Sequence, residues 1–484
     1  MSFSVSHDSA SSASRTSLAD SLSPQVRSKL IQRTGGRARG SHLPPAPKLE
    51  AKIMREERSC WPCVFQRDKI WESNFLQCGP GPVCLRCVKR SFRLNGNHSL
   101  LCDRTRLEDL APCFLPLLMT SMHELEELRA FYGQHVDCIY PDALAVEFES
   151  GHGPKIICEV YQFKPRTPEL LSQLQYVKNP RTGKYQAREE RSPPLAMQLM
   201  ENRDVSLYDS YLDLFVEHHL PGFPRCCFAD EPDNFQPRLL ELMCELYHGT
   251  ANEKPFLRPV LHLVLRLVVA TYIMGHTLNL SDNTKDEIAR RLGSPREKFG
   301  RFCSPRMANR QLKFLFSFLH RKCMKALLNK IQNILRHSKV RETWILAFCI
   351  VLGLGMVDEE IQKTIHIIMN SKWTRKQMPQ ADAEWQAQWA CEAIDKKFEY
   401  ITDLFRRKYN SSSRSMNPLA DHDHTEVAQC LGGAATDFVR RVHALVVEKE
   451  NYLSERRRVP ISTDTQESYT SRLVSRFLSS FWCP

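Results

Sequence analysis

Long apolar segments are rare in this sequence of 484 residues. Its first ten residues contain no apolar stretch of the kind that a secretory signal needs, so we expect a reducing compartment without structural disulfides. The best candidates for a membrane span are residues 260–275, which include His262 and Arg266, and residues 344–357, which fall short of the roughly 20 residues that cross a bilayer. We therefore predict two buried helices and no membrane partner.

Signatures of common enzyme classes are missing as well. The sequence contains no Gly-Lys-Ser or Gly-Lys-Thr phosphate-binding loop and no Gly-x-Ser-x-Gly nucleophile elbow. We predict that the chain is not an enzyme. A helical enzyme of unknown class stays an alternative, and it would need a deep polar pocket within residues 195–456.

Positive charge and cysteine are abundant, and both are unevenly distributed. The formal net charge is +12, and residues 1–110 hold 18 Lys and Arg against 10 Asp and Glu. A basic block of this kind suits a polyanionic partner or a nuclear-import receptor. Six of the 18 cysteines fall within residues 60–102. In a reducing compartment, clustered cysteines indicate a metal site.

Apolar periodicity predicts a mainly α fold with a large helical body. Apolar residues recur at three- and four-residue steps from Leu312 to Leu335, from Trp385 and Trp389 to Phe405, and from Val427 to Leu445. These stripes are typical of amphipathic helices that face a common core. The predicted segments are a disordered, basic and Ser-rich N-terminal region (1–54), a small zinc-cluster module (55–110), a mixed segment (111–190), a helical regulatory domain (191–456) and a flexible C-terminal tail (457–484).

The mixed segment contains a short β-hairpin signal. Leu144, Val146 and Phe148 alternate along the chain, residues 150–154 have the composition of a turn, and residues 156–163 resume an apolar pattern. Two such runs around a turn predict paired antiparallel strands.

Two Cys-x2-Cys pairs are the strongest chemical signal in the sequence. Two residues between thiolates allow both sulfurs to reach one zinc ion at about 2.3 Å. The six candidate metal ligands are Cys60, Cys63, Cys78, Cys84, Cys87 and Cys102.

The segment from Arg58 to Lys69 resembles the first half of the fungal binuclear zinc cluster, the C6 finger of a large class of transcription factors. That family spaces its cysteines as C-x2-C-x6-C, then five to twelve residues, then C-x2-C-x6–8-C. A basic residue usually precedes the third cysteine, and Lys69 has that place, but residue 70 is Ile. Omitting residues 70–77 brings Cys78 to the third position. We interpret these eight residues as a loop insertion.

The second half of the cluster departs from the family in the same way. Fourteen residues separate Cys87 from Cys102, and omitting residues 92–99 restores the family's spacing. The resemblance implies that all six cysteines bind two structural zinc ions. Metal binding would then supply much of the folding free energy of so small a module.

The same resemblance implies double-stranded DNA as the partner. In the family, a short helix after each Cys-x2-Cys pair approaches DNA, and the first one reads a GC-rich triplet in the major groove. The matching basic residues, which could contact guanine edges or phosphates, are Arg67, Lys69, Arg86, Lys89 and Arg90.

These observations favour a nuclear, zinc-dependent, DNA-binding transcription regulator whose helical body receives a signal or a protein partner. The substituted position Ile70 and the two insertions leave a second hypothesis open, namely a zinc-stabilised interaction protein that has lost sequence-specific DNA binding.

Overall fold

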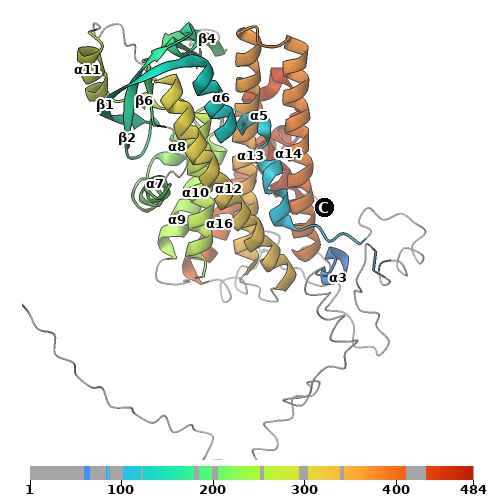
Figure 1. Ribbon diagram of the computed structural model, residues 1–484. Helices are drawn as coiled ribbons and strands as arrows, with labels where there is room; N and C mark the ends of the chain where they lie inside the picture. Colours follow the sequence, from blue (N-terminus) through green and yellow to red (C-terminus); the bar gives the residue numbers. More distant parts are fainter. Residues whose placement is uncertain are drawn as a thin grey trace, which may run out of the picture.

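Helices dominate the part of the chain that the computed structural model describes, as predicted (Figure 1). The structure describes residues 59–65, 83–84, 87, 102–120, 124–178, 185–198, 205–250, 256–293, 303–337, 343–409 and 432–482. Helices before the body are α3 (Trp61–Phe65), η3 (Leu107–Phe114), α5 (Leu117–Thr120), α6 (Leu125–His135) and η4 (Pro168–Leu171). The body itself contains α7 (Ser206–His218), α8 (Phe223–Cys227), α9 (Phe235–Gly249), α10 (Arg258–Gly275), α11 (Asp282–Arg291), α12 (Arg306–His337), α13 (Thr343–Thr374), α14 (Gln380–Tyr409), α16 (Gly433–Glu448), α17 (Glu450–Arg456), η6 (Thr463–Ser468) and α18 (Arg472–Trp482).

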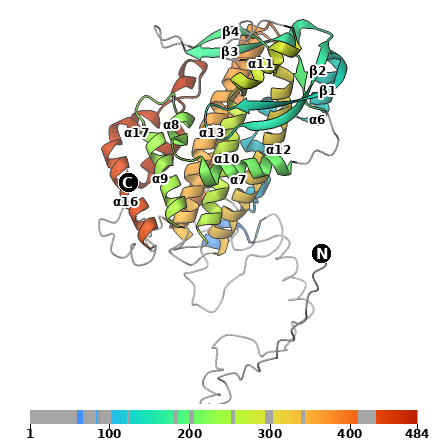
Figure 2. The same ribbon diagram turned by 90° about the vertical axis from the view of Figure 1, so that its left-hand side faces the viewer.

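The predicted hairpin is confirmed and forms the centre of a small antiparallel sheet. Strands β1 (Val136–Glu149) and β2 (Ile156–Pro165) pair in the register that places Phe148 opposite Ile156. The short strands β5 (Leu195–Ala196) and β6 (Asn279–Leu280) extend the sheet in the order β5-β2-β1-β6. A separate two-stranded sheet joins β3 (Ser172–Lys178) to β4 (Tyr185–Arg191). Figure 2 shows both sheets at the same end of the helical body.

Helix α13 is the central element of the body. Its residues from Trp344 to Val357 are all buried, because α10, α12, α14 and α18 pack around it. Gly353 permits a close approach of α10, since a Cβ at this position would overlap the Val264 side chain of α10. The predicted buried helix at residues 344–357 is therefore confirmed.

Helix α10 is the second element whose burial was predicted. By length and composition alone it could cross a membrane, but 67% of the apolar window is buried inside the protein. The buried core helices of globular proteins meet the same criterion. Its two central ionisable side chains face acids on α7: Arg266 binds Asp213 at 3.0 Å, and His262 lies 3.5 Å from the same carboxylate.

The predicted core stripe of α12 is confirmed, whereas that of α14 is wrong at its start. Trp385 and Trp389 are 66% and 61% exposed. Small side chains, Ala383 and Ala387, take the inward positions instead and let α14 approach α13 closely. Further along α14, Phe405 is buried as the periodicity predicts.

Within the segment 457–484, which was expected to be a flexible tail, nearly all of residues 469–478 are buried and form part of the core. Arg472 begins α18 with no exposed surface, and its guanidinium donates to both carboxylate oxygens of Asp395 at 2.6 and 2.7 Å. The Glu359 carboxylate accepts the main-chain N–H groups of Leu473 and Val474. Burial opposes ionisation of Asp395, but the Arg472 hydrogen bonds hold its pKa below the usual range. The helix is thus fixed at its first turn by buried acids from α13 and α14.

Candidate metal centre

Two cysteine pairs meet at one end of the helical body, beside α3. Cys60 directly precedes this short helix and Cys63 lies within it, whereas Cys84 and Cys87 come from a separate segment. All four side chains are buried, and their sulfur atoms lie within 4.8 Å of one another. Figure 1 shows α3 near the ends of α12 and α14. The predicted convergence of the two pairs is therefore observed.

The spacing of the four sulfurs matches the requirements of a tetrahedral zinc ion. Cys60 Sγ lies 3.9 Å from Cys84 Sγ and 3.6 Å from Cys87 Sγ, and Cys63 Sγ lies 3.7 Å from Cys84 Sγ. Four ligands at about 2.3 Å from a tetrahedral centre are separated by roughly 3.8 Å. The group can therefore hold one metal ion without rearrangement of its sulfurs.

Burial and mutual hydrogen bonds shift the pKa values of these thiols in opposite directions. A hydrogen bond with Cys63 and burial raise the pKa of the Cys60 thiol, and burial raises the pKa of Cys87. Burial acts in the same direction on Cys84, but hydrogen bonds from the Cys87 main chain and from neighbouring thiols lower its pKa to about 6. A divalent ion at the centre would stabilise all four as thiolates, because metal ligation requires the deprotonated sulfur.

The remaining two predicted ligands are placed differently. Cys102 is 5% exposed and adjoins the group, but its sulfur accepts the main-chain N–H of Cys84 at 3.0 Å and is not one of the four converging sulfurs. Its backbone has a positive φ of 38°, a conformation that is unusual for a residue with a side chain. Cys78 lies outside the described residues. Its ligation and the second zinc ion stay predictions.

Trp61, between Cys60 and Cys63, anchors the cysteine group to the helical body. Its side chain has no exposed surface and belongs to the main hydrophobic core. The indole Nε1 donates to the Thr105 carbonyl at 2.9 Å, and the Arg336 guanidinium of α12 lies 4.1 Å from the ring centroid. Arg336 also donates to the Ser59 carbonyl at 2.6 Å.

A second set of contacts holds the chain that leaves the cysteine group. The Tyr400 hydroxyl of α14 donates to the Asp103 carboxylate. The Leu107 main-chain N–H donates to Gln332 Oε1 of α12 at 2.8 Å. Two long helices therefore contact the cysteine group and its flanking residues, α12 through Trp61 and α14 through Asp103.

Sequence reasoning did not identify these anchoring residues. The one available signal was the tryptophan between two ligands, since a bulky aromatic side chain in so small a module needs a partner surface. The five basic residues expected to contact DNA, Arg67, Lys69, Arg86, Lys89 and Arg90, lie outside the described residues.

Comparison with known proteins places the helical body in a family. No curated protein and no solved structure matches the chain. A family model of KpeA transcription factors matches residues 114–477, which is most of the chain and begins just after the cysteine group. The chain belongs to the KpeA transcription factor family.

Proposed function

We propose that this transcription factor is a zinc-dependent, DNA-binding regulator of the fungal C6-finger type that acts in the nucleus. The observation that carries the proposal is the group of four buried thiols with tetrahedral zinc spacing, attached to a body of a transcription factor family. Membership of that family also favours a regulator over the helical enzyme considered above.

Zinc in this site would be structural. Four protein sulfurs complete a tetrahedral shell and leave no open position for a substrate or a water nucleophile. The metal would fix the segments that bear Arg67, Lys69, Arg86, Lys89 and Arg90, whose charges would contact phosphates or guanine edges. In the full C6 cluster, Cys78 and Cys102 would join the four to bind a second zinc ion.

A second candidate is a zinc-stabilised interaction module that does not read DNA. It is favoured by one observation, which is that four thiols already complete a single-metal site while the Cys102 sulfur is engaged by a main-chain N–H. On this hypothesis one zinc ion is bound, and the insertions 70–77 and 92–99 are compatible with it.

The zinc content of the purified full chain distinguishes the candidates. We expect two zinc ions per chain by elemental analysis, and fewer in Cys78→Ser and Cys102→Ser. Cys63→Ser should lose zinc from the four-thiol group, whereas Cys138→Ser, which removes an exposed cysteine elsewhere, should match the parent chain. One zinc ion that survives Cys102→Ser supports the second candidate, and no zinc in the reduced chain refutes both.

DNA binding is tested separately by site selection from random duplexes at several salt concentrations. The C6-finger proposal expects an enriched GC-rich triplet and weaker binding for Arg67→Ala. Replacing a residue that contacts only phosphates would reduce the salt dependence of binding without changing the selected sequence. A chain that retains zinc and selects no sequence favours the interaction module.

A further inference from the structure

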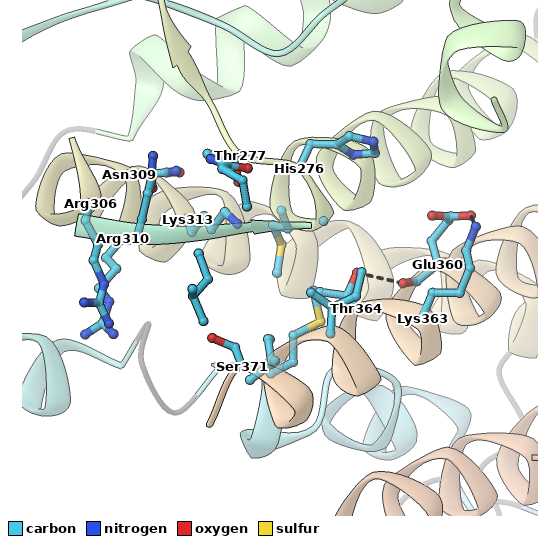
Figure 3. Close-up of a pocket in the computed structure, with 18 of the residues that line it drawn as sticks. His276, Thr277, Arg306, Asn309, Arg310, Lys313, Glu360, Lys363, Thr364 and Ser371 are labelled. Atoms are coloured by element: carbon cyan, nitrogen blue, oxygen red, sulfur yellow. Dashed lines mark hydrogen bonds and ion pairs between the residues drawn. The ribbon is translucent and has the colours of Figure 1, made fainter. Parts of the chain in front are cut away.

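A cavity of about 520 Å³ lies at the other end of α12, among elements that are distant in sequence. It is lined by the first turns of α12, the second half of α13, the end of α10, helix α8 and strand β3. Its volume falls in the range of small-molecule sites. Figure 3 shows Arg306, Arg310 and Lys313 together on one side, and Glu360 with Lys363 on the other. We call this space the basic cavity.

Cations outnumber acids in the lining. Among the described residues, six Lys or Arg side chains line the basic cavity, against the two acids Asp230 and Glu360. Both acids bind one cation, because Lys363 Nζ lies 2.8 Å from Asp230 and also pairs with Glu360. The lining therefore carries a surplus of positive charge at the α12 side.

One further acid behind the lining compensates only part of this surplus. Glu169 binds Arg306 at 3.0 Å and lies 3.9 Å from Arg375. Within the described part of the chain, no carboxylate lies within 4 Å of the ammonium group of Lys313 or Lys372. Two lysines thus face the basic cavity without an acidic partner.

The pKa values of these cations agree with positive charges gathered in a desolvated place. Burial and then Arg310 lower the pKa of Lys313 to about 8 and also lower the pKa of Lys372. Burial and then Arg306 lower the pKa of Arg310 to about 9. An anion among these groups would remove the electrostatic penalty that the pKa shifts record.

Unused hydrogen-bond donors line the same space. The side-chain amide nitrogens of Gln173 and Gln175 are buried and meet no acceptor among the described residues. Gln173 is only 7% exposed, so its amide nitrogen has lost contact with water and has no acceptor among the described residues. Such groups cost free energy unless a ligand or water satisfies them. Apolar side chains, Met119, Leu174 and Ile368, complete the lining.

We propose that the basic cavity binds a small organic anion that carries carboxylate or phosphate groups. The anionic group would lie against Lys313 and Arg310, the glutamine amides would donate to its oxygens, and its carbon skeleton would contact the apolar lining. The ligand would bridge α12 to α13. This inference does not depend on DNA binding or on zinc stoichiometry, because every residue involved lies after the cysteine group, between Met119 and Gln377.

The test uses the purified full chain with two probes, inorganic phosphate and citrate, titrated at constant ionic strength against sodium chloride. Calorimetric binding and the midpoint of thermal unfolding are measured. We expect a saturable response to at least one probe beyond that of chloride. Phosphate alone would identify a phosphate-type ligand, citrate alone a carboxylate-type ligand, and both would support the proposal.

Lys313→Met should weaken binding of the anion by about tenfold or more, because a charge-assisted contact is lost while an unbranched side chain of similar length remains. The matched control is Lys325→Met, which removes an exposed lysine from the same helix twelve residues further on. Lys372→Met provides a second cavity variant if the first misfolds, as judged by circular dichroism. No saturable response in the parent chain, or equal affinities in the cavity and control variants, would overturn the proposal.

Discussion

Replacing Trp61 by alanine should detach the cysteine group from the helical body while leaving the metal ligands intact. The indole ring has no exposed surface, so the substitution removes one of the largest buried side chains in the protein. It also removes the ring from beneath Arg336 and the donor to the Thr105 carbonyl. None of the four converging sulfurs is altered.

The magnitude follows from burial. Truncation of a buried tryptophan to alanine typically costs about 3–5 kcal/mol, a range that already includes the cavity left behind. The lost cation–π contact and hydrogen bond fall within that range and are not added to it, because neighbouring terms are not independent. Since about 1.4 kcal/mol is a factor of ten, the equilibrium between docked and detached group should shift by two to three and a half orders of magnitude.

Hydrogen exchange measures this shift directly. We expect faster exchange at the amide of Leu107, which donates to Gln332 in the docked state, together with unchanged zinc content. Trp385→Ala is the matched control, since that ring is 66% exposed and its loss should cost less than about 0.5 kcal/mol. Equal protection of Leu107 in both variants would refute the reasoning.

Other consequences concern the body. Arg472→Met leaves the buried Asp395 carboxylate with Arg476 as its remaining cationic partner and should cost about 3 kcal/mol in urea unfolding, with a cost below 1 kcal/mol contradicting the assignment. Gly353→Ala should cost about 1–3 kcal/mol through overlap with Val264, and the added change Val264→Ala should cost less than the sum of the two single changes, as a double-mutant cycle will show. The depressed pKa of Lys313 means that the unfolded chain binds more protons between about pH 8 and 10.5, so this group makes stability rise with pH in that window. Relative to Lys313→Met, the free energy of unfolding of the parent chain should rise by up to about 3 kcal/mol across this pH window. Parallel profiles of unfolding free energy against pH for the two chains would disprove the burial of this charge.

Local patterns predicted the elements whose partners lie nearby in sequence. The hairpin was predictable because alternation at Leu144, Val146 and Phe148 and the turn that follows are both local signals. The two Cys-x2-Cys pairs could likewise be identified from the sequence, because zinc coordination restricts the spacing between ligands. In both cases the sequence signal and the physical constraint act over the same short range.

Long-range packing explains the failures. Helix α14 has aromatic residues on one face and small residues on another, and periodicity alone does not say that Ala387 rather than Trp385 faces α13. Helix α18 follows a stretch rich in polar residues and resembles a tail, because its partner Asp395 is 77 residues away. The basic cavity was not predicted for the same reason, since its lining residues come from segments as far apart in sequence as Met119 and Gln377.

The docking of Trp61 has a consequence for the order of events on the ribosome. Arg336 lies 277 residues beyond its acceptor Ser59, and Tyr400 lies 297 residues beyond Asp103. At about 5–20 residues per second, roughly 14 to 60 s pass between synthesis of the cysteine group and synthesis of the helices that hold it. During that interval the thiols are exposed to the metal pool of the cell and to oxidants. If the four thiols bind zinc as proposed, the ion can enter before the docking helices exist, and its binding would protect the thiols of the nascent chain from oxidation.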